Sequence, residues 1–372
     1  MFIGITNTPR DYAWGSTTAI AGLLGTPPTG RPEAELWFGA HPGSPSRLVG
    51  RAGTLADLVP GRLPFLLKVL AAASSLSLQA HPTPEQAEAG FAAENAAGIP
   101  IDASERNYKD AFHKPELIYA LSDDFRALCG FRPVVETRAV LRPVAGDARI
   151  ALLFDRLVDD SSLRDVFEWL ITRGPGVDAL VAALVEAAET AEGLSWQTVR
   201  QLAHDFPGDP GIAISLLLHT VALKPGEVLY LPAGNIHAYL HGLGVELMAA
   251  SDNVLRGGLT PKHVDVPELL QVLDFRPLPV PYLHAEEPQP GVRVFRPDVP
   301  DFVLTVISPD AAAAGVTIEL AGPAIALCTS GSVSLAGGPE LSRGSAVYVA
   351  DEPRLQLHGS GLVFMASTGR GV

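Results

Sequence analysis

The sequence is poor in cysteine and lysine, with two and five of these residues respectively, and it has no long uncharged apolar run. Cys129 and Cys328 lie far apart in segments of unlike character, which excludes a disulfide framework and fits a reducing compartment. Charged residues interrupt the longest apolar stretches, and the first residues lack the basic and apolar regions of a signal peptide. These absences predict a cytoplasmic protein without a membrane-spanning segment.

Basic residues are also in the minority, because 27 Lys and Arg stand against 41 Asp and Glu, for a formal net charge of −14. Such a chain is a poor candidate for binding nucleic acid or an anionic membrane over a broad surface. The five lysines nevertheless fall in two stretches, 64–116 and 219–263, which favours a locally basic pocket for a small anion. Hydrophobic residues make up 47% of the chain, enough for a buried core, and 36 Gly with 32 Pro favour many short strands.

Three kinds of sequence follow one another, and together they predict a mainly β fold with a helical insert. Residues 1–130 and 216–275 mix short β-like runs with turns. Residues 131–215 repeat apolar residues at three- and four-residue intervals, which predicts helices. Residues 276–372 open on a Pro-rich linker and continue as β-branched runs between Gly turns, typical of a small β-sandwich or barrel. The expected strands include 34–38, 65–70, 76–81, 227–231, 236–240, 302–307, 316–320, 324–328, 333–335, 346–350 and 362–365.

The strongest motif runs from Gly226 through Pro232 and Gly234 to His237. One strand ends at the Pro-x-Gly turn, and the next delivers His237 and Tyr239 to the same face, because side chains alternate along a strand. The spacing is similar to the second half of the cupin signature, in which this histidine is a metal ligand. The alternative is an ordinary hairpin with a half-buried histidine.

A second motif is an alternating run that places Ser77, Gln79 and His81 on one face. A polar face in an apolar chain needs partners, because unpaired polar groups are costly to bury. Metal coordination by Gln79 and His81 would supply such a partner.

A third motif contains Glu116, which begins an apolar run where a carboxylate needs a partner or a cation. With Gln79, His81 and His237 it would offer two imidazole nitrogens, an amide oxygen and one carboxylate. This set fits Zn²⁺, with water completing an open site. His113 is the competing ligand candidate; otherwise it is a residue near the ligands or on the surface.

A fourth segment, 246–262, gathers polar and basic residues shortly after the His237 hairpin. Arg256 follows Asp252 at a short distance and precedes two glycines, so its guanidinium could clamp a phosphate or carboxylate with two hydrogen bonds. The alternative is a surface turn with solvated charges.

Together the four segments resemble the type I mannose-6-phosphate isomerases, the zinc-dependent phosphomannose isomerases of the cupin superfamily. The resemblance extends over 12–16, 34–42, 63–70 and 260–262. It implies a cupin jelly-roll catalytic domain (1–130 plus 216–275), a helical domain (131–215) and a second, metal-free jelly-roll-like domain (276–372). His358, the lone histidine near the end of that last domain, is expected on the surface or satisfied.

The resemblance further implies isomerisation of mannose 6-phosphate and fructose 6-phosphate through a cis-enediol(ate), with one Zn²⁺ per chain. The implied zinc ligands are Gln79, His81, Glu116 and His237. The residues implied to line the substrate pocket are Trp14, Glu35, Lys68, Ser77, Lys114, Tyr239, Asp252, Arg256 and Lys262.

Within that pocket, Ser77 with Lys68 or Lys262 is expected to contact the phosphate, and Arg256 to lie near the reacting carbons. The base that moves the carbon-bound proton is left open among Asp252, Lys114 and Glu35. Two other classes stay open: a non-catalytic sugar-phosphate-binding cupin and a metal-dependent cupin dioxygenase. No nucleic-acid or membrane partner is expected, and the chain is expected to be a monomer, with a homodimer as the alternative.

Overall fold

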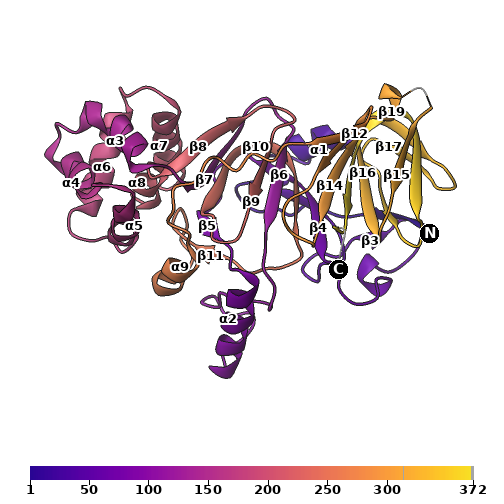
Figure 1. The fold of residues 1–372 in the computed structure, drawn as a ribbon, viewed down its shortest axis with the longest axis horizontal. Helices are drawn as coiled ribbons and strands as arrows, with labels where there is room; N and C mark the ends of the chain where they lie inside the picture. Colours follow the sequence, from indigo (N-terminus) through magenta and orange to yellow (C-terminus); the bar gives the residue numbers. More distant parts are fainter. Residues whose placement is uncertain (313, 370–372) are drawn as a thin grey trace.

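The computed structural model describes residues 1–312 and 314–369, and it has three parts arranged in a row (Figure 1). A helical part lies at one end, a nine-stranded sheet lies in the middle, and a ten-stranded sheet lies at the other end. The expectation of a mainly β fold with a helical part is therefore confirmed. Among the described residues, none of the helices has the length and apolar character needed to cross a membrane.

The middle sheet is organised around one long strand, β10 (His237–Ala249), which pairs antiparallel with four others. It is rich in small and apolar residues, and both of its faces are largely buried. The remaining strands are β2 (Glu35–Phe38), β4 (Phe65–Ala72), β5 (Gln79–Ala80), β6 (Glu116–Ala120), β7 (Phe125–Phe131), β8 (Leu218–Leu223), β9 (Val228–Leu231) and β11 (Leu255–Arg256).

The helical part fills residues 134–215. Asp147 and Asp159 begin helical segments there by accepting hydrogen bonds from Arg149 N and Ser161 N, as N-cap residues do. A break separates α5 from α6 at residues 172–176, where the sequence has two glycines and a proline. The α-helices are α3 (Val134–Leu141), α4 (Ala148–Arg156), α5 (Leu163–Ile171), α6 (Val177–Ala188), α7 (Leu194–Asp205) and α8 (Gly211–Ser215). Three more helices, α1 (Ala19–Leu24), α2 (Pro84–Ala96) and α9 (Val266–Val272), lie outside this part.

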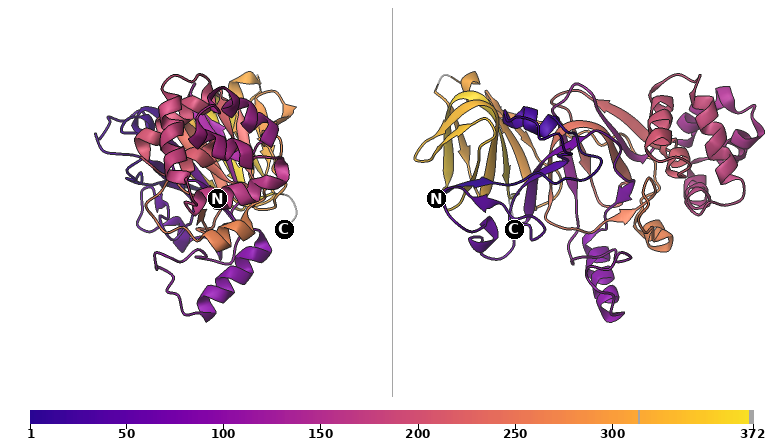
Figure 2. Two further views of the ribbon diagram at one scale, coloured as in Figure 1. Left: turned by 90° about the vertical axis from the view of Figure 1, so that its left-hand side faces the viewer. Right: turned by 180° about the vertical axis from the view of Figure 1, so that it is seen from behind.

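The ten-stranded sheet combines the C-terminal strands with two from the beginning of the chain. β1 (Phe2–Thr6) pairs with β18 (Ala346–Val349) and with β3 (Arg47–Leu48), so the N-terminal residues complete this sheet (Figure 2). The other strands are β12 (Glu286–Gln289), β13 (Val292–Phe295), β14 (Val303–Ile307), β15 (Val316–Glu319), β16 (Ala324–Leu335), β17 (Glu340–Ser342) and β19 (Arg354–Ser367).

Several strand predictions are wrong in detail: the expected strands 236–240 and 362–365 belong to the much longer β10 and β19. The expected strands 324–328 and 333–335 are one continuous strand, β16, because β19 pairs with it across the Gly331 position. The expected strand 76–81 is reduced to β5, at 79–80. The residues before it bond to two different segments: Leu76 N donates to Tyr239 O, whereas Leu78 N donates to Gly258 O and Leu78 O accepts from Gly257 N.

Candidate functional site

Strand pairing brings the four predicted metal ligands to one place. His237, the first residue of β10, lies directly opposite Gln79 on β5. Glu116, the first residue of β6, lies between β10 and β9, and His81 follows β5. The turn before β10 uses Gly234 at a φ of 79°, a left-handed conformation that glycine adopts without strain.

The donor atoms face one another inside this cluster. Glu116 Oε1 is 3.2 Å from His81 Nε2, and Glu116 Oε2 is 3.3 Å from His237 Nε2. The amide of Gln79 approaches His237 Nε2 at 3.4 Å. The two histidines and the glutamate are almost completely buried, and their ligand atoms all lie within 4.8 Å of one another.

The other ring nitrogen of each histidine is bonded to a backbone carbonyl. His81 Nδ1 is 2.7 Å from Asn253 O, and His237 Nδ1 is 3.0 Å from Asn235 O. A carbonyl can only accept, so both Nδ1 atoms carry the proton and both Nε2 lone pairs point into the cluster. This is the arrangement of a metal-ligating histidine supported from behind by a hydrogen-bond acceptor.

The donor set fits a zinc ion. His81 Nε2 and Glu116 Oε2 are buried and have no hydrogen-bond partner among the described residues, an arrangement that is costly unless a cation joins them. Rotation of the Gln79 amide by 180° exchanges its nitrogen and oxygen, and it would turn the oxygen toward the same point. Two imidazoles, a carboxylate and an amide oxygen would then surround one point, with an open position for water or a substrate.

The protonation states also suit a cation. Burial, reinforced by the charge of Lys114, lowers the pKa of His81 to about 4. Burial alone would raise the pKa of Glu116, but Lys114 and the two histidines hold it well below its usual range. Lys114 Nζ is 3.0 Å from Glu116 Oε1. Neutral imidazoles and an ionised carboxylate are the forms that bind metal.

A second buried cluster lies farther along the same sheet and includes three of the residues predicted for the pocket. Lys68 Nζ is 2.9 Å from Glu246 Oε2 and 3.6 Å from Glu35 Oε1. Trp37 Nε1 donates to Glu35 Oε2 at 2.8 Å. The ring of the buried Tyr239 lies 6.2 Å from that of His237, which links the two clusters. Lys68, Glu35 and Tyr239 are therefore inside the protein and line no described cavity.

Glu246 was not predicted as a site residue. Burial raises its pKa to about 7, helped by repulsion from Glu116 and Glu35 and opposed by Lys68. Burial alone would lower the pKa of the Lys68 ammonium group, but the charges of Glu246, Glu35 and Glu116 outweigh it and raise that pKa. Glu246 could have been selected in the same way as Glu116, because each is a lone carboxylate in an apolar strand.

A cavity of about 790 Å³ opens beside the metal cluster. Gln79 is the one metal-ligand candidate in its lining. Arg256, opposite Gln79 in the β11–β5 pair, brings a cation to the wall, where partial burial lowers the pKa of its guanidinium. The end of α7 supplies another part of the wall through His204, Asp205 and Phe206, none of which was predicted. The predicted pocket residues in the lining are Trp14, Ser77, Arg256 and Lys262.

The other predicted residues lie elsewhere. Asp252 is about half exposed, and its Oδ1 is 3.4 Å from Nε2 of the buried His41, a residue the sequence gave no reason to select. His113 lies outside the ligand cluster and pairs with Asp301 of the C-terminal part at 2.8 Å. His358 is exposed, as expected.

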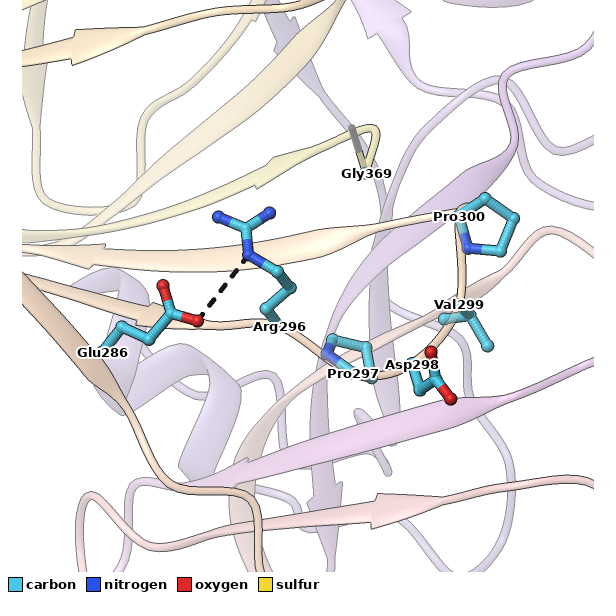
Figure 3. A pocket seen from close by; sticks show the side chains of 7 residues that line it. All are labelled: Glu286, Arg296, Pro297, Asp298, Val299, Pro300 and Gly369. Atoms are coloured by element: carbon cyan, nitrogen blue, oxygen red, sulfur yellow. Dashed lines mark ion pairs between the residues drawn. The ribbon is translucent and has the colours of Figure 1, made fainter. Parts of the chain in front are cut away.

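A separate cavity of about 470 Å³ lies in the C-terminal part (Figure 3). Its walls come from 296–300, Glu286 and Gly369, with Arg296 Nε 3.9 Å from Glu286 Oε1. It shares no residue with the metal cluster or with the cavity beside it.

Fold and site together define a class of protein: a β-rich chain with a buried His–Glu–His metal site beside a cavity that carries cationic side chains. Residues 2–134 match the family model for the catalytic domain of type I phosphomannose isomerase. The chain belongs to the type I phosphomannose isomerase family, which confirms the resemblance found in the sequence.

Individual relatives agree with this assignment. A mannose-6-phosphate isomerase of Escherichia coli K12 is 40% identical over 92% of this chain and 93% of its own. A mannose-6-phosphate isomerase of Bos taurus is 33% identical over 94% of this chain and 93% of its own length. Among solved structures, mannose 6-phosphate isomerase from Salmonella typhimurium bound to fructose 6-phosphate and zinc superposes with a TM-score of 0.90, at 36% identity and 99% coverage of both chains.

Proposed function

We propose that this chain is a zinc-dependent isomerase that interconverts mannose 6-phosphate and fructose 6-phosphate. The observation that carries the proposal is the buried donor set of His81, Glu116 and His237, with Gln79 joining it to the adjacent cavity. Family membership supports the same reaction, because the relatives carry the name of this enzyme and a structural neighbour holds zinc and fructose 6-phosphate. One zinc ion per chain, ligated by these four residues, is part of the proposal.

We assign the middle sheet to a cupin jelly-roll catalytic domain, formed by 1–130 and 216–275. The antiparallel pairing around β10 and the structural match to phosphomannose isomerase support this assignment. Residues 131–215 would form the helical domain, and 276–372 a second jelly-roll-like domain to which β1 adds a strand.

Substrate binding is assigned to the cationic side of the cavity. A phosphate monoester carries about −1.5 to −2 charges at neutral pH and binds where several donors converge. Ser77 and Lys262 line the cavity and are the proposed phosphate contacts, whereas Lys68 is buried among carboxylates. Arg256, nearer to the metal ligands through its pairing with Gln79, would stabilise charge at the reacting carbons.

The isomerisation moves one proton from C2 to C1 of the open-chain aldose, and a hydroxyl proton is lost from O2 and gained by O1. Bound zinc would supply positive charge that favours the enediolate. Glu35 accepts from Trp37 and pairs with Lys68, so proton transfer is assigned to Lys114 and Asp252. Lys114 is the better placed of the two, 3.0 Å from a zinc ligand.

A coupled assay that follows fructose 6-phosphate formed from mannose 6-phosphate tests the proposal. Turnover should disappear on chelation and return with Zn²⁺, and His237→Ala should lose both activity and stoichiometric zinc. His358→Ala is the matched control, since His358 is an exposed histidine outside the ligand cluster and should keep both.

Two results would contradict the proposal in different ways. Binding of sugar phosphates without turnover would favour a non-catalytic cupin. Bound iron or copper with no stimulation by zinc would favour a cupin dioxygenase.

A further inference from the structure

The loop that carries Lys114 has no secondary structure of its own. Residues 107–115 lie between Arg106 and β6 without forming a helix or a strand. Their backbone polar groups must still find partners, because buried N–H and C=O groups are costly when left unpaired. Among the described residues, the side chain of Asn253 supplies more of these bonds than any other, four against two from Glu94.

Asn253 is completely buried and uses both ends of its amide on this loop. Its Oδ1 accepts from Lys109 N at 2.7 Å and from Asp110 N at 3.2 Å. Its Nδ2 donates to Asp110 O and to Phe112 O, both at 2.8 Å. The side chain thus takes the place of a neighbouring strand for the residues just before Lys114.

The backbone carbonyl of the same residue accepts from His81 Nδ1 at 2.7 Å. That bond holds the imidazole in the tautomer whose Nε2 faces Glu116. Asn253 therefore contacts a metal-ligand candidate through its backbone and the Lys114 loop through its side chain.

The two residues before Asn253 also hydrogen-bond to the loop. Ser251 Oγ, also fully buried, donates to Asp110 Oδ1 at 2.8 Å, and Asp252 N donates to Asp110 Oδ2 at 3.0 Å. Lys114 and Asp252, the two groups assigned to proton transfer, are in this way held by one set of hydrogen bonds.

We propose that Asn253 is a positioning residue that couples the zinc site to the Lys114 loop, so that zinc affinity and Lys114 placement depend on its amide. The inference rests on the proposed function only for its kinetic part. Its metal-binding part stands on the bond from His81 Nδ1 to the Asn253 carbonyl: an alanine keeps this carbonyl but loses the amide bonds to 109–112 that fix its position. Supporting hydrogen bonds of this kind typically change metal affinity or activity by about 10–100-fold when removed.

The test compares Asn253→Ala with Asn107→Ala. Asn107 lies on the same loop and donates one side-chain hydrogen bond, to Asp265 Oδ2 at 2.9 Å, away from the metal cluster. For each variant, zinc affinity is measured by chelator competition, kcat and KM by the coupled assay, and stability by thermal unfolding.

We expect Asn253→Ala to weaken zinc binding by about tenfold or more and to lower kcat by at least as much, with a smaller change in KM. Asn107→Ala should lower only the unfolding midpoint. Parental zinc affinity and kcat in Asn253→Ala, whatever its stability, would overturn the inference.

Ser251→Ala keeps the experiment decisive if Asn253→Ala does not fold. It removes a hydroxyl that faces two acceptors on the same loop, Asp110 Oδ1 at 2.8 Å and Phe112 O at 3.1 Å, and that accepts from Asn253 N at 3.2 Å, while the Asn253 amide stays in place. It should shift zinc affinity and kcat in the same direction by a smaller factor, and no shift in either would again reject the inference. Absence of turnover in the parent chain would instead reject the proposed function, while the zinc affinities would still test the role of Asn253.

Discussion

Arg256 faces the cavity from β11, directly across from Gln79. If its guanidinium stabilises charge that develops as the enediolate forms, its removal should act on kcat. We expect Arg256→Ala to lower kcat by about 10²–10³-fold with a modest change in KM. Arg256→Lys should recover only part of the loss, because it keeps the charge but not the planar fork of donors. Steady-state kinetics of both variants would check this.

If Arg256 only binds the phosphate of the substrate, its variants should show the opposite pattern in kcat and KM. A contact made equally to the bound phosphate and in the transition state would raise KM and leave kcat nearly unchanged. Near-parental kcat in Arg256→Ala, with zinc content and fold intact, would remove Arg256 from the chemical step. Lys262→Ala provides the comparison, since Lys262 is assigned to the phosphate and should mainly raise KM.

Glu246 gives the molecule a pH dependence of known sign. Folded, it keeps its proton up to a pKa of about 7, mainly because it is buried, whereas an ordinary glutamate loses it near pH 4.5. Between these values the folded state binds more protons than the unfolded state, so its contribution to stability falls as the pH rises. Thermal unfolding from pH 5 to 7.5, at constant zinc, should show a flatter profile in Glu246→Gln than in the parent. Parallel profiles would contradict this assignment.

At the scale of elements, the turn between β9 and β10 is constrained by a backbone hydrogen bond and by close contacts. Gly234 N donates to His81 O at 2.9 Å, so the turn is bonded to one metal-ligand candidate and leads to another, His237. A Cβ on Gly234 would lie 3.1 Å from Val272 O and 3.3 Å from Asp274 N. We expect Gly234→Ala to lower both the unfolding midpoint and zinc affinity, because the left-handed backbone and the contacts oppose it.

Gly30→Ala is the matched control for this turn. Gly30 has a similar φ of 75°, but a Cβ there would meet nothing within 4 Å. Gly30→Ala should lower the free energy of unfolding only by the backbone strain, about 1–2 kcal/mol, and leave zinc affinity unchanged. Equal effects of the two substitutions on zinc binding would show that the turn does not position His81 and His237.

The elements predicted well from sequence are those defined by local pattern. The Pro-x-Gly turn between two apolar runs identifies β9 and the start of β10, and the helices of 134–215 follow from their spacing. The expected hairpin is wrong, however, because β9 and β10 each pair with β6 and not with each other. Partners far apart in the chain leave no such local signal. The pairing of β1 with β18 joins residues more than 300 positions apart, and β1 alone reads as an ordinary strand.

The same limit applies to the site. Gln79, His81 and His237 stand in short motifs, and Glu116 is conspicuous in an apolar strand, so the ligand candidates could be selected before the fold was known. Glu246 is equally conspicuous, but its partner Lys68 lies opposite it on β4, a pairing that only the sheet register reveals. Asn253 looks like a loop residue until its contacts with 109–112 are seen.

At the scale of the whole molecule, the metal-ligand strands lie between two cores. The core of the helical part extends to Ile236 and Ala238, the two residues that flank His237. A second core joins the middle sheet to the C-terminal sheet through side chains such as Phe65 and Phe364. Both neighbouring parts therefore support the strands that carry the ligands, without contributing ligands themselves.

This arrangement predicts a local response to zinc removal. The proposed ligands on β5, β6 and β10, together with His81, all come from the middle part of the molecule, so chelation should abolish turnover while helix content is retained. Zinc that binds only the folded state adds stability that grows with its concentration, about 4 kcal/mol at a thousandfold excess over Kd. The unfolding midpoint should therefore fall on chelation and rise again as zinc is restored.

Hydrogen exchange measured with and without chelator would locate the change. Amide protection should fall near His81, Glu116 and His237 and in the Lys114 loop, because the ligand cluster anchors these segments. Protection in α6 and in β14 should be unaltered, since neither element carries a proposed ligand or belongs to the middle sheet. A loss of protection spread evenly over all three parts would mean that zinc stabilises the molecule globally, and that the two flanking cores depend on the metal cluster for their folding.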